Sequence, residues 1–543
     1  MRDTALNRTA GPPRQRRRLR AGPAALALVV ALSAQTAAAQ VIKLDGEAPA
    51  GGPDHFLLPF DVPAGTQEIE VRHVDGSPAN ILDFGLEDPG GPRGWGGDTA
   101  EPTVVNASAA SRGYRPGAIV PGRWRVIVGK AKVVETPARY AVEVELRQAT
   151  TLAPDPTRST YTPPAPRAEP RWYKGDFHVH SRESTDAKAS LADDAALAER
   201  RGLDFIEISD HNTTTQLDFF GDVATKHPSV LLLPGIEVTT YAGHANAIGA
   251  TRWVEHKVGQ PGVTMAGSVD AVMAQGALFA INHPVLDLGT LCIGCAWKHD
   301  VDPTKVSAVE IATGSGAALL ADPALAFWDD LLARGSRAAA IGGSDDHRAG
   351  VVDGPLQSPI GSPTTLVYAT ELSPAGVVEA VRAGRTVVKL TGPDDPMAEV
   401  EVRAAVAGPP LGKVGDTAKV RSAYVRATIT GASGQRVRLV KNGARLDEID
   451  VTADPFSFDL RVEAPAQGQD RYRAEVLVDG KLRTVTSHVW VALDPAGPEA
   501  TAPPTDDGGC RAAPRDTSRA TALFAAIVAA LAYAVGRRAR SRG

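Results

Sequence analysis

The chain has 543 residues, a formal net charge of −5 at pH 7, and 43% hydrophobic and 22% charged residues. It is too long for one ordinary domain and long enough for about three. The hydrophobic share is large enough to fill packed cores, and the small negative charge gives no sign of a nucleic-acid-binding protein.

The N-terminal residues 1–39 have the order of a secretory signal peptide. Five arginines within residues 14–20 precede an apolar run at 24–32, and small residues at 37–39 follow it. We expect cleavage near Ala39 and an exported protein. An N-terminal membrane anchor is the alternative, which is disfavoured because the apolar run is too short to span a bilayer.

Residues 41–150 predict an all-β domain, since short alternating segments are separated by turns rich in glycine and proline. These segments are 55–60, 68–73, 124–128 and 140–146. Their layout is similar to the small secreted β-sandwiches that accompany hydrolases, such as the bacterial pre-peptidase C-terminal domain. Residues 151–170 contain six prolines without hydrophobic periodicity and predict a linker.

Residues 171–393 alternate strand-like and helix-like segments. The predicted strands are 176–180, 205–209, 230–234, 246–249, 278–282, 308–312 and 338–342. The predicted helices are 189–201, 269–275 and 323–334, and the first has Ser190 as its N-cap and Gly202 as its stop. About seven strands with helices between them predict an α/β fold with a parallel barrel.

The C-terminal part predicts a second all-β domain and a membrane segment. Residues 399–495 resemble an immunoglobulin-type sandwich, with Asn442-Gly443 as a hairpin turn. A linker at 496–519 precedes an apolar stretch at 520–536, which is at the short limit for a membrane helix.

The membrane segment is followed by arginines, so the positive-inside rule places the tail in the cytoplasm and the body outside. The order Gly509-Cys510, apolar helix and arginine cluster resembles the C-terminal sorting tails of myxobacterial-type surface proteins. That resemblance implies removal of the helix and a role for Cys510 in anchoring. A permanent single-pass anchor is the alternative, and in both cases we expect the cell envelope or surface.

Cys292 and Cys295 form a C-x-x-C pattern with three interpretations. In an exported protein the pair favours a local disulfide. A zinc site with His299 would have three ligands where structural zinc sites have four. A redox motif is the third interpretation, and the usual sequence setting of such motifs is missing.

His178 and His180 alternate with apolar Phe177 and Val179 on one predicted strand. Side chains two residues apart on a strand point to the same face, where both imidazoles can bind one divalent metal ion. Two surface histidines on a polar loop would look the same, so the pair alone does not establish a metal site.

Further polar residues stand where the later strands begin or end. They are Asp210, His211, Glu237, His244, His283, Asp345 and His347. In a barrel of parallel strands the carboxyl ends converge on one mouth. We therefore expect these side chains to lie together with His178 and His180.

The motifs His-x-His, Ser-Asp-His, Gly-x-Glu, Asn-His-Pro and Gly-Ser-Asp-x-His occur in this order within 171–393. The series resembles the polymerase-and-histidinol-phosphatase (PHP) superfamily, and the exported β-sandwich setting is similar to its CehA/McbA-type metallohydrolases. The resemblance implies a distorted (β/α)7 barrel flanked by two sandwiches, with two or three divalent ions of zinc, manganese or iron. The ligands that it implies are His178, His180, Asp186, His211, Glu237, His244, His283, Asp345 and His347, with Glu237 bridging two ions.

Several residues near the ligand motifs have two interpretations. Asp186 is either a ligand or a helix cap, and Asp210 either orients a ligand imidazole or caps a turn. Asp346 stands where the family often has a small residue, so it either supports the ligands or repels anionic substrates. Arg182, Lys188 and Arg348 either hold phosphate or carboxylate oxygens or are solvated surface charges.

The ligand types favour a metal-dependent hydrolase. Clustered metal ions make hydroxide available near neutral pH, so no serine or cysteine nucleophile is needed. The catalytic candidates are Asp345, His347, Asp210 and Arg348. We expect a small-molecule phosphoester as substrate, with a carbamate, carboxylic ester or amide as the alternative and a non-catalytic surface scaffold as the third hypothesis. We expect neither a nucleic-acid partner nor an obligate protein partner.

Overall fold

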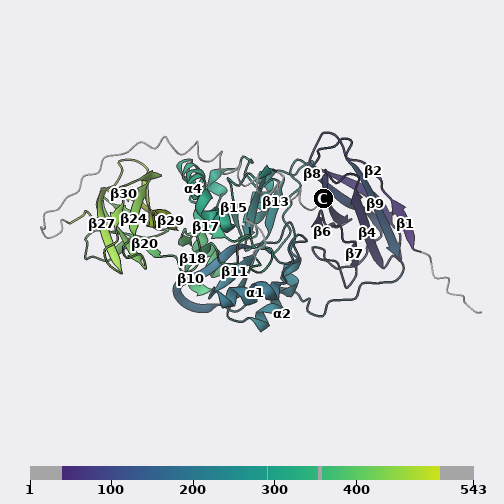
Figure 1. Ribbon diagram of the computed structural model, residues 1–543, viewed down its shortest axis with the longest axis horizontal. Coiled ribbons are helices and arrows are strands. Elements are labelled where there is room, and N and C mark those ends of the chain that lie inside the picture. Colours follow the sequence, from purple (N-terminus) through teal and green to yellow (C-terminus); the bar gives the residue numbers. More distant parts are fainter. Residues whose placement is uncertain (1–38, 290–291, 352–356, 502–543) are drawn as a thin grey trace, which may run out of the picture. The chain divides into compact units, whose positions relative to one another are not determined.

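The computed structural model describes residues 39–289, 292–351 and 357–501 (Figure 1). These residues form a mixed α/β protein that consists mostly of β-sheets and has few helices. The predicted signal peptide, Cys510 and the apolar stretch 520–536 lie outside the described residues. Within the described ranges, no helix is long and apolar enough to cross a membrane.

The N-terminal part consists of two antiparallel sheets around one core. The first sheet contains β1 (Gln40–Lys43), β2 (Gly46–Glu47), β4 (Glu68–Asp75), β7 (Thr103–Asn106) and β9 (Arg139–Arg147). The second contains β3 (His55–Val62), β5 (Ile81–Asp88), β6 (Gly91–Gly97) and β8 (Gly122–Lys132). Alternate side chains of both sheets, among them Ile69, Phe84 and Trp124, are buried together between them.

The central part contains strands of two further sheets. In the first, the strand order is β12 (Leu231–Pro234), β11 (Phe205–Ile208), β10 (Arg167–Val179), β18 (Thr364–Leu372) and β19 (Thr386–Lys389). In the second it is β13 (Glu237–Thr240), β14 (Gly243–Ile248), β15 (Leu278–Ile281), β16 (Ala308–Thr313) and β17 (Ala339–Gly343).

The structure confirms a mixed α/β class. It does not show a parallel (β/α)7 barrel. β10, β11 and β12 are parallel, as are β15, β16 and β17, whereas β13–β14–β15 and β10–β18–β19 pair antiparallel. An antiparallel pair needs only a short turn and no crossover helix, which explains the small number of helices. The sequence did not reveal this because a strand buried on both faces is a continuous apolar run in either orientation.

The two central sheets meet at the ends of their strands. Isolated parallel bridges join Val179 to Asp346 and His211 to Glu237. Both bridges involve residues directly beside or within the predicted ligand motifs, so the chain topology brings these motifs to one place.

Within the described residues, five α-helices accompany the central sheets. They are α1 (Leu191–Arg200), α2 (Phe220–Lys226), α3 (Met265–Met273), α4 (Ala317–Ala333) and α5 (Pro374–Arg382), with short 3-10 turns at Thr215–Phe219, Pro303–Lys305 and Gly314–Gly316. Ser190 caps α1 as expected, in a capping box with Asp193. α4 begins six residues before the predicted start at Pro323, because Ala317 and Ala321 already pack into the core.

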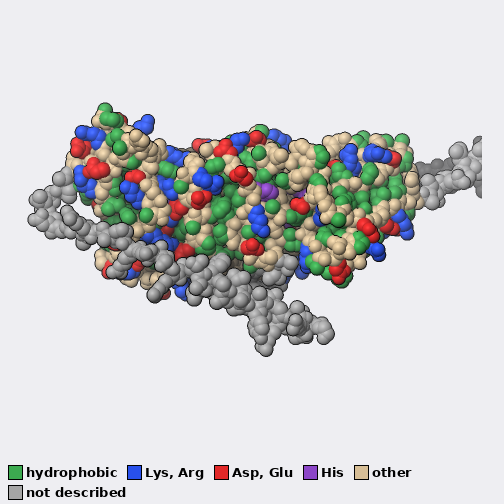
Figure 2. All heavy atoms as spheres, turned by 90° about the horizontal axis from the view of Figure 1, so that it is seen from above, with side chains coloured by type: hydrophobic (Ala, Val, Ile, Leu, Met, Phe, Trp, Pro, Cys, Tyr) green, Lys and Arg blue, Asp and Glu red, His purple; other side chains and the backbone are tan. Residues whose placement is uncertain are grey.

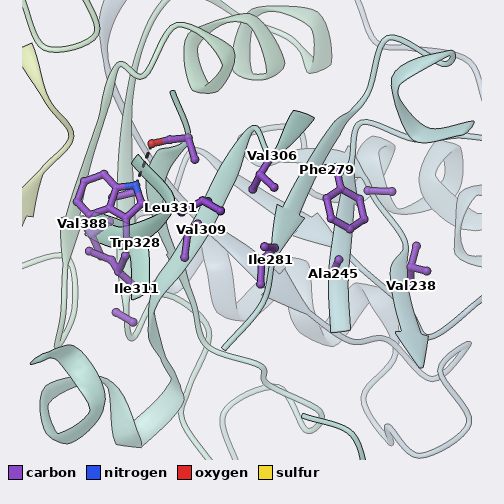
Figure 3. Close-up of a cluster of buried hydrophobic side chains, with 14 of the residues drawn as sticks. Val238, Ala245, Phe279, Ile281, Val306, Val309, Ile311, Trp328, Leu331 and Val388 are labelled. Atoms are coloured by element: carbon purple, nitrogen blue, oxygen red, sulfur yellow. Dashed lines mark hydrogen bonds between the residues drawn. The ribbon is translucent and has the colours of Figure 1, made fainter. Parts of the chain in front are cut away.

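A large core lies between the second central sheet and α4 (Figure 3). Trp328 of α4 is fully buried and packs there with Val309 and Ile311 of β16. Its indole Nε1 donates to the carbonyl oxygen of Ala338 at 2.9 Å, so the polar atom of this large side chain is satisfied. This core therefore fixes the positions of strands β16 and β17.

Strand β10 starts inside the predicted linker 151–170. Arg167 pairs with Leu372 of β18, and the register shifts between Ala168 and Arg171, the interval that contains Pro170. A proline cannot donate to the ladder and is accommodated where the register shifts. Because of the high proline content of 151–170, the sequence did not predict the first residues of β10, the strand that contains His178.

The C-terminal sandwich shares a sheet with the central part. One of its sheets contains β20 (Met397–Arg403), β21 (Pro410–Lys413), β23 (Ser422–Thr430) and β27 (Phe456–Glu463). The other contains β22 (Thr417–Val420), β24 (Arg436–Lys441), β25 (Ala444–Arg445), β26 (Ile449–Asp450), β28 (Gln469–Val478), β29 (Lys481–Thr486) and β30 (Val489–Leu493). β29 pairs with β19, so one 12-stranded sheet runs through both parts.

The turn between β24 and β25 has the predicted hairpin form. Asn442 and Gly443 have φ of 51° and 87°, as a two-residue hairpin loop of this kind requires.

Candidate metal centre

The carboxylate of Glu237, at the start of β13, is the centre of a histidine cluster. Five imidazoles lie within 3.6 Å of its oxygens, and its side chain is 1% exposed. The distances are 3.4 Å for His178, 3.6 Å for His180, 2.7 Å for His211, 3.2 Å for His244 and 3.4 Å for His283. One buried carboxylate therefore contacts histidines from several separate strands and loops.

Two further carboxylates complete the cluster. Asp345 Oδ1 lies 3.3 Å from His178 Nε2 and 3.2 Å from His180 Nε2. Asp186 Oδ2 lies 3.2 Å from His211 Nε2 and 3.4 Å from His347 Nε2. The structure thus brings together all nine residues that the sequence predicted as ligands. Ser190, and not Asp186, caps the following helix.

Local backbone geometry aims these side chains at one another. Strand β10 puts His178 and His180 on one face, with their ring centroids 5.0 Å apart. His283 and Asp345 have positive φ values of 26° and 55°, which are costly for residues with a Cβ. Hydrogen bonds hold both: His283 N donates to Glu310 Oε2, and Asp345 N donates to the carbonyl oxygen of His178.

Most of the imidazoles use one ring nitrogen for an orienting contact and turn the other towards the carboxylates. His178 Nδ1 lies 3.1 Å from Glu310 Oε1. The other contacts are His180 Nδ1 with Ser184 Oγ, His211 Nδ1 with Thr239 Oγ1, His244 Nε2 with Ile293 O, His283 Nδ1 with Cys295 O, and His347 Nδ1 with Asp345 O. Contacts of this kind fix the ring orientation and tautomer of metal-binding histidines.

Glu310 contacts His178 and the backbone of His283 and is not among the residues predicted from the sequence. A charged residue inside the apolar strand β16 is the signal that would have found it, because an acidic side chain is almost never fully buried without a partner. Asp176 of β10 is a second such residue. Its carboxylate accepts from the backbone N–H groups of His178, Ser344 and Gly361 and fixes the start of the ligand-bearing segment.

The charges in the cluster are strongly interdependent. Burial, the largest influence, lowers the pKa of His178, but Asp345, Glu237 and Glu310 together raise it well above its usual value. Burial likewise raises the pKa of Glu237, while the neighbouring imidazolium charges hold it well below its usual range. Burial and the positive charges of His347 and His211 lower the pKa of His180 to about 3. The carboxylates therefore require positive charge among them, which protons or metal ions can supply.

Two buried nitrogen atoms show that the site fits a metal ion. His178 Nε2 and His180 Nε2 are fully buried and lie 3.3 and 3.2 Å from Asp345 Oδ1, but neither forms a well-aligned hydrogen bond among the described residues. A buried polar atom without a partner costs about 1–3 kcal/mol. Both nitrogen atoms lie next to Asp345. A divalent ion between them would be bound by His178, His180 and Asp345. Imidazole and carboxylate ligands suit zinc, manganese and iron.

The cluster can be divided into groups whose ligand atoms all lie within 4.8 Å of one another. These groups are His178–His180–Asp345, His178–Glu237–His283, His180–His211–His347 and His244–His283–Cys295. His178 and His283 each belong to two of these groups.

The hydrogen bonds of Asp210 and Asp346 come from backbone N–H groups and, for Asp210, also from the Ser181 hydroxyl. Asp210 is fully buried and accepts from Ser181 N and Oγ, both at 2.7 Å, and burial raises its pKa to about 8. Asp346 accepts from the backbone N–H groups of Arg348, Gly350 and Ile360. Both carboxylates thus stabilise the turns that carry the ligands.

A cavity of about 590 Å³ is lined by Lys188 and Arg348, and none of the nine predicted ligands lines it. The N–H of Lys188 donates to the carbonyl oxygen of His347, which ties this wall to the ligand loop. Arg200 also lines the cavity, whereas Arg182 does not. On the face shown in Figure 2, histidine side chains reach the surface with basic and acidic side chains beside them.

The N-terminal sandwich contacts the loops that follow the ligands. Tyr241, in the β13–β14 turn, donates to Asp83 of β5 at 2.5 Å, and Glu183 accepts from the N–H of Gly113 at 3.3 Å. Burial raises the pKa of Asp83 to about 7, against the lowering effect of the Tyr241 hydrogen bond. The sandwich therefore supports the ligand-bearing loops.

Cys292 and Cys295 are joined by a disulfide, with their Cα atoms 5.7 Å apart. His299 contacts the hydroxyl of Thr240 through Nε2 at 2.7 Å. Both sulfur atoms are used in the disulfide, so this arrangement differs from a zinc site built with His299.

The fold and the cluster together define a mixed α/β protein with a candidate multi-metal site. No family model matches the sequence, and no curated protein matches it. The chain is similar to the structure of a two-domain protein from Bacteroides vulgatus ATCC 8482, described as containing a predicted PHP-like metal-dependent phosphoesterase. The identity is 20%, the match covers 61% of this chain and 98% of that one, and the TM-score is 0.33.

A CARDB domain from Pyrococcus furiosus also matches, with 19% identity over 18% of this chain and 98% of that one and a TM-score of 0.13. At these identities and TM-scores the two similarities establish neither the fold nor the function.

Proposed function

We propose that this protein is a metal-dependent hydrolase of the PHP type that cleaves phosphoesters at a centre of two or three divalent ions. The observation that carries the proposal is the convergence of five imidazoles on Glu237. The ordered ligand motifs support the same family, and a distorted (β/α)7 arrangement of the central strands is part of the proposal. So are export and attachment to the cell envelope, which rest on terminal segments outside the described residues.

When bound, divalent ions supply hydroxide near neutral pH and positive charge that stabilises an anionic transition state. The residues of the chain would bind these ions and orient the ligand rings. His178, His180 and Asp345 hold one side of the centre, and Asp186 with His347 holds the other. Glu310 keeps the His178 ring in place through Nδ1, so that Nε2 faces the carboxylates.

The cavity beside His347 favours an anionic substrate. Lys188, Arg200 and Arg348 line it, together with Asp193, which belongs to the α1 capping box. Guanidinium and ammonium groups are the usual partners of phosphate oxygens. A phosphoester that places its phosphorus at the centre would therefore have cations beside its remaining oxygens.

Hydrolysis of a carbamate, carboxylic ester or amide would use the same ligands, and substrate comparison separates the two hypotheses. We would assay metal-replete protein with bis-p-nitrophenyl phosphate, p-nitrophenyl phosphate and p-nitrophenyl acetate. The proposal predicts faster cleavage of a phosphate substrate, whereas cleavage of the acetate alone would establish the alternative. A metal-replete protein that cleaves none of them would support the non-catalytic scaffold.

The assignment of the centre is tested by His178→Ala in the same assay. We expect loss of bound metal and of hydrolysis, since His178 contacts two carboxylates of the cluster. His227→Ala is the matched control, because His227 contacts Glu199 away from the cluster. Full activity of His178→Ala would show that the centre is wrongly assigned.

A further inference from the structure

The loop at 292–298 lies against the turn between β13 and β14, and it touches two of the proposed ligands. The carbonyl oxygen of Ile293 lies 3.2 Å from His244 Nε2, and that of Cys295 lies 3.1 Å from His283 Nδ1. These contacts turn His244 Nδ1 and His283 Nε2 towards Glu237. The loop that contains the disulfide therefore positions both imidazoles.

The sulfur of Cys295 is itself close to these imidazoles. The ligand atoms of His244, His283 and Cys295 all lie within 4.8 Å of one another. Cys295 is buried at 1% exposure, whereas Cys292 is half-buried. Of the two cysteines, Cys295 thus lies beside the imidazoles, and Cys292 is the more exposed residue.

Several contacts that do not involve the disulfide hold the loop in place. Gly294 has a φ of 76°, and a Cβ at this position would lie 2.7 Å from the Cα of Tyr241. Lys298 N donates to the carbonyl oxygen of Ala242, and Trp297 N donates to that of Pro284. We expect the loop to keep its position when the disulfide opens, so that Cys295 stays beside the imidazoles.

We propose that the Cys292–Cys295 disulfide is a redox switch of the metal centre. In the oxidised form, the loop only orients His244 and His283. In the reduced form, the Cys295 sulfur becomes a third ligand, together with these two imidazoles, for a thiophilic divalent ion such as zinc. The inference rests on the proposed metal centre and adds to it a second, redox-dependent ligand set.

Reduction requires an external dithiol. Its thiolate attacks Cys292 Sγ, the sulfur of the more exposed cysteine, the S–S bond breaks, and Cys295 leaves as a thiolate. The second thiol of the reductant then releases Cys292 as a thiol, and the reductant ends as a cyclic disulfide. The Cys295 thiolate is the form of cysteine that binds metal ions.

Cobalt(II) alone is the probe, because a bond from sulfur to cobalt gives an intense near-ultraviolet charge-transfer absorption. The full-length metal-free protein is reduced with dithiothreitol, freed of reductant under argon and titrated with cobalt, beside the oxidised protein. We expect cobalt binding in both forms and the sulfur absorption only in the reduced form. We also expect reduction to raise the preference for zinc over manganese, because a thiolate is a soft ligand that suits zinc better than manganese.

Two single variants separate the sulfur ligand from opening of the loop. Cys292→Ser leaves Cys295 free and should show the absorption without reduction. Cys295→Ser keeps Cys292 and Cys510 but should not show it under any condition. Absence of the band from both the reduced wild type and Cys292→Ser, or its presence in Cys295→Ser, would overturn the inference. Failure of the oxidised protein to bind any cobalt would instead refute the metal centre, and the redox switch with it.

Discussion

At the scale of single residues, Glu310 is the clearest example of a side chain that acts through others. One carboxylate oxygen lies 3.1 Å from His178 Nδ1, and the other accepts from the N–H of His283 at 2.8 Å. Its side chain therefore fixes the ring of one proposed ligand and the strained backbone of another. It is fully enclosed by β16 and the site, with 2% exposure.

We predict that Glu310→Gln weakens metal binding by about 10–100-fold, the range seen when such orienting partners are replaced. The amide keeps the size of the side chain but removes the charge that stabilises the His178 orientation. Chelator competition measures the affinity, and thermal unfolding of the metal-free variant checks that the fold is intact. Glu371→Gln is a control, since Glu371 accepts from the hydroxyl of Ser373, the N-cap of α5. Unchanged metal affinity in Glu310→Gln would contradict the positioning role.

The ligands were predictable because each stands in a short motif at a strand end, as His178 and His180 do on β10. Their partners were not. Glu310 and Thr239 are far in sequence from the imidazoles that they contact, those of His178 and His211, and only the fold brings them close. The contact of the Cys295 carbonyl with His283 likewise depends on how a loop folds back.

At the scale of elements, helix capping and turn chemistry correctly predicted α1 and the turn at 442–443. The pairing of strands that are far apart in the sequence was predicted poorly. Capping and turn chemistry act over a few residues and are visible in the sequence. Strand direction is set by partners far away in the chain. The antiparallel pairing of β13 with β14, and of β10 with β18, was therefore missed, together with the start of β10 at Arg167.

Helix α1 gives a direct test of a local element that adjoins the site. Ser190→Ala removes the side-chain acceptor for Asp193 N and the partner of the Asp193 carboxylate. We expect a loss of about 1 kcal/mol in the free energy of unfolding, the usual cost of an N-cap removed to alanine. Denaturant unfolding at neutral pH measures it. A change indistinguishable from zero would mean that the capping box does not stabilise α1 in solution.

At the scale of the whole molecule, the sheet that passes from β19 to β29 links the central part to the C-terminal sandwich. His488, between β29 and β30, lies at this junction. Its ring packs against Trp328 of α4, with centroids 4.6 Å apart, and it is 3% exposed. Burial, helped by the charges of Arg473 and Arg471, holds its pKa well below the usual value of 6.5.

Because His488 is buried, the free energy of unfolding depends on pH, and the direction of this dependence can be stated. His488 stays neutral in the folded chain and takes up a proton when unfolded, so it destabilises the fold as pH falls through the unfolded pKa near 6.5. Between pH 7 and pH 5 one such histidine lowers the free energy of unfolding by about 2 kcal/mol. In His488→Gln, we expect the loss of stability over this interval to be smaller by about that amount. An identical pH dependence in both proteins would show that His488 is not held neutral.

The number of divalent ions bound per chain depends on the carboxylate at the middle of the histidine cluster. Glu237→Gln keeps the shape of the side chain that contacts five imidazoles but removes its charge. Elemental analysis of metal-replete protein, expressed as divalent ions per chain, is the measurement. The account predicts two or three ions in the wild type and at least one fewer in Glu237→Gln. A wild type without bound divalent metal, or a variant with undiminished content, would contradict it.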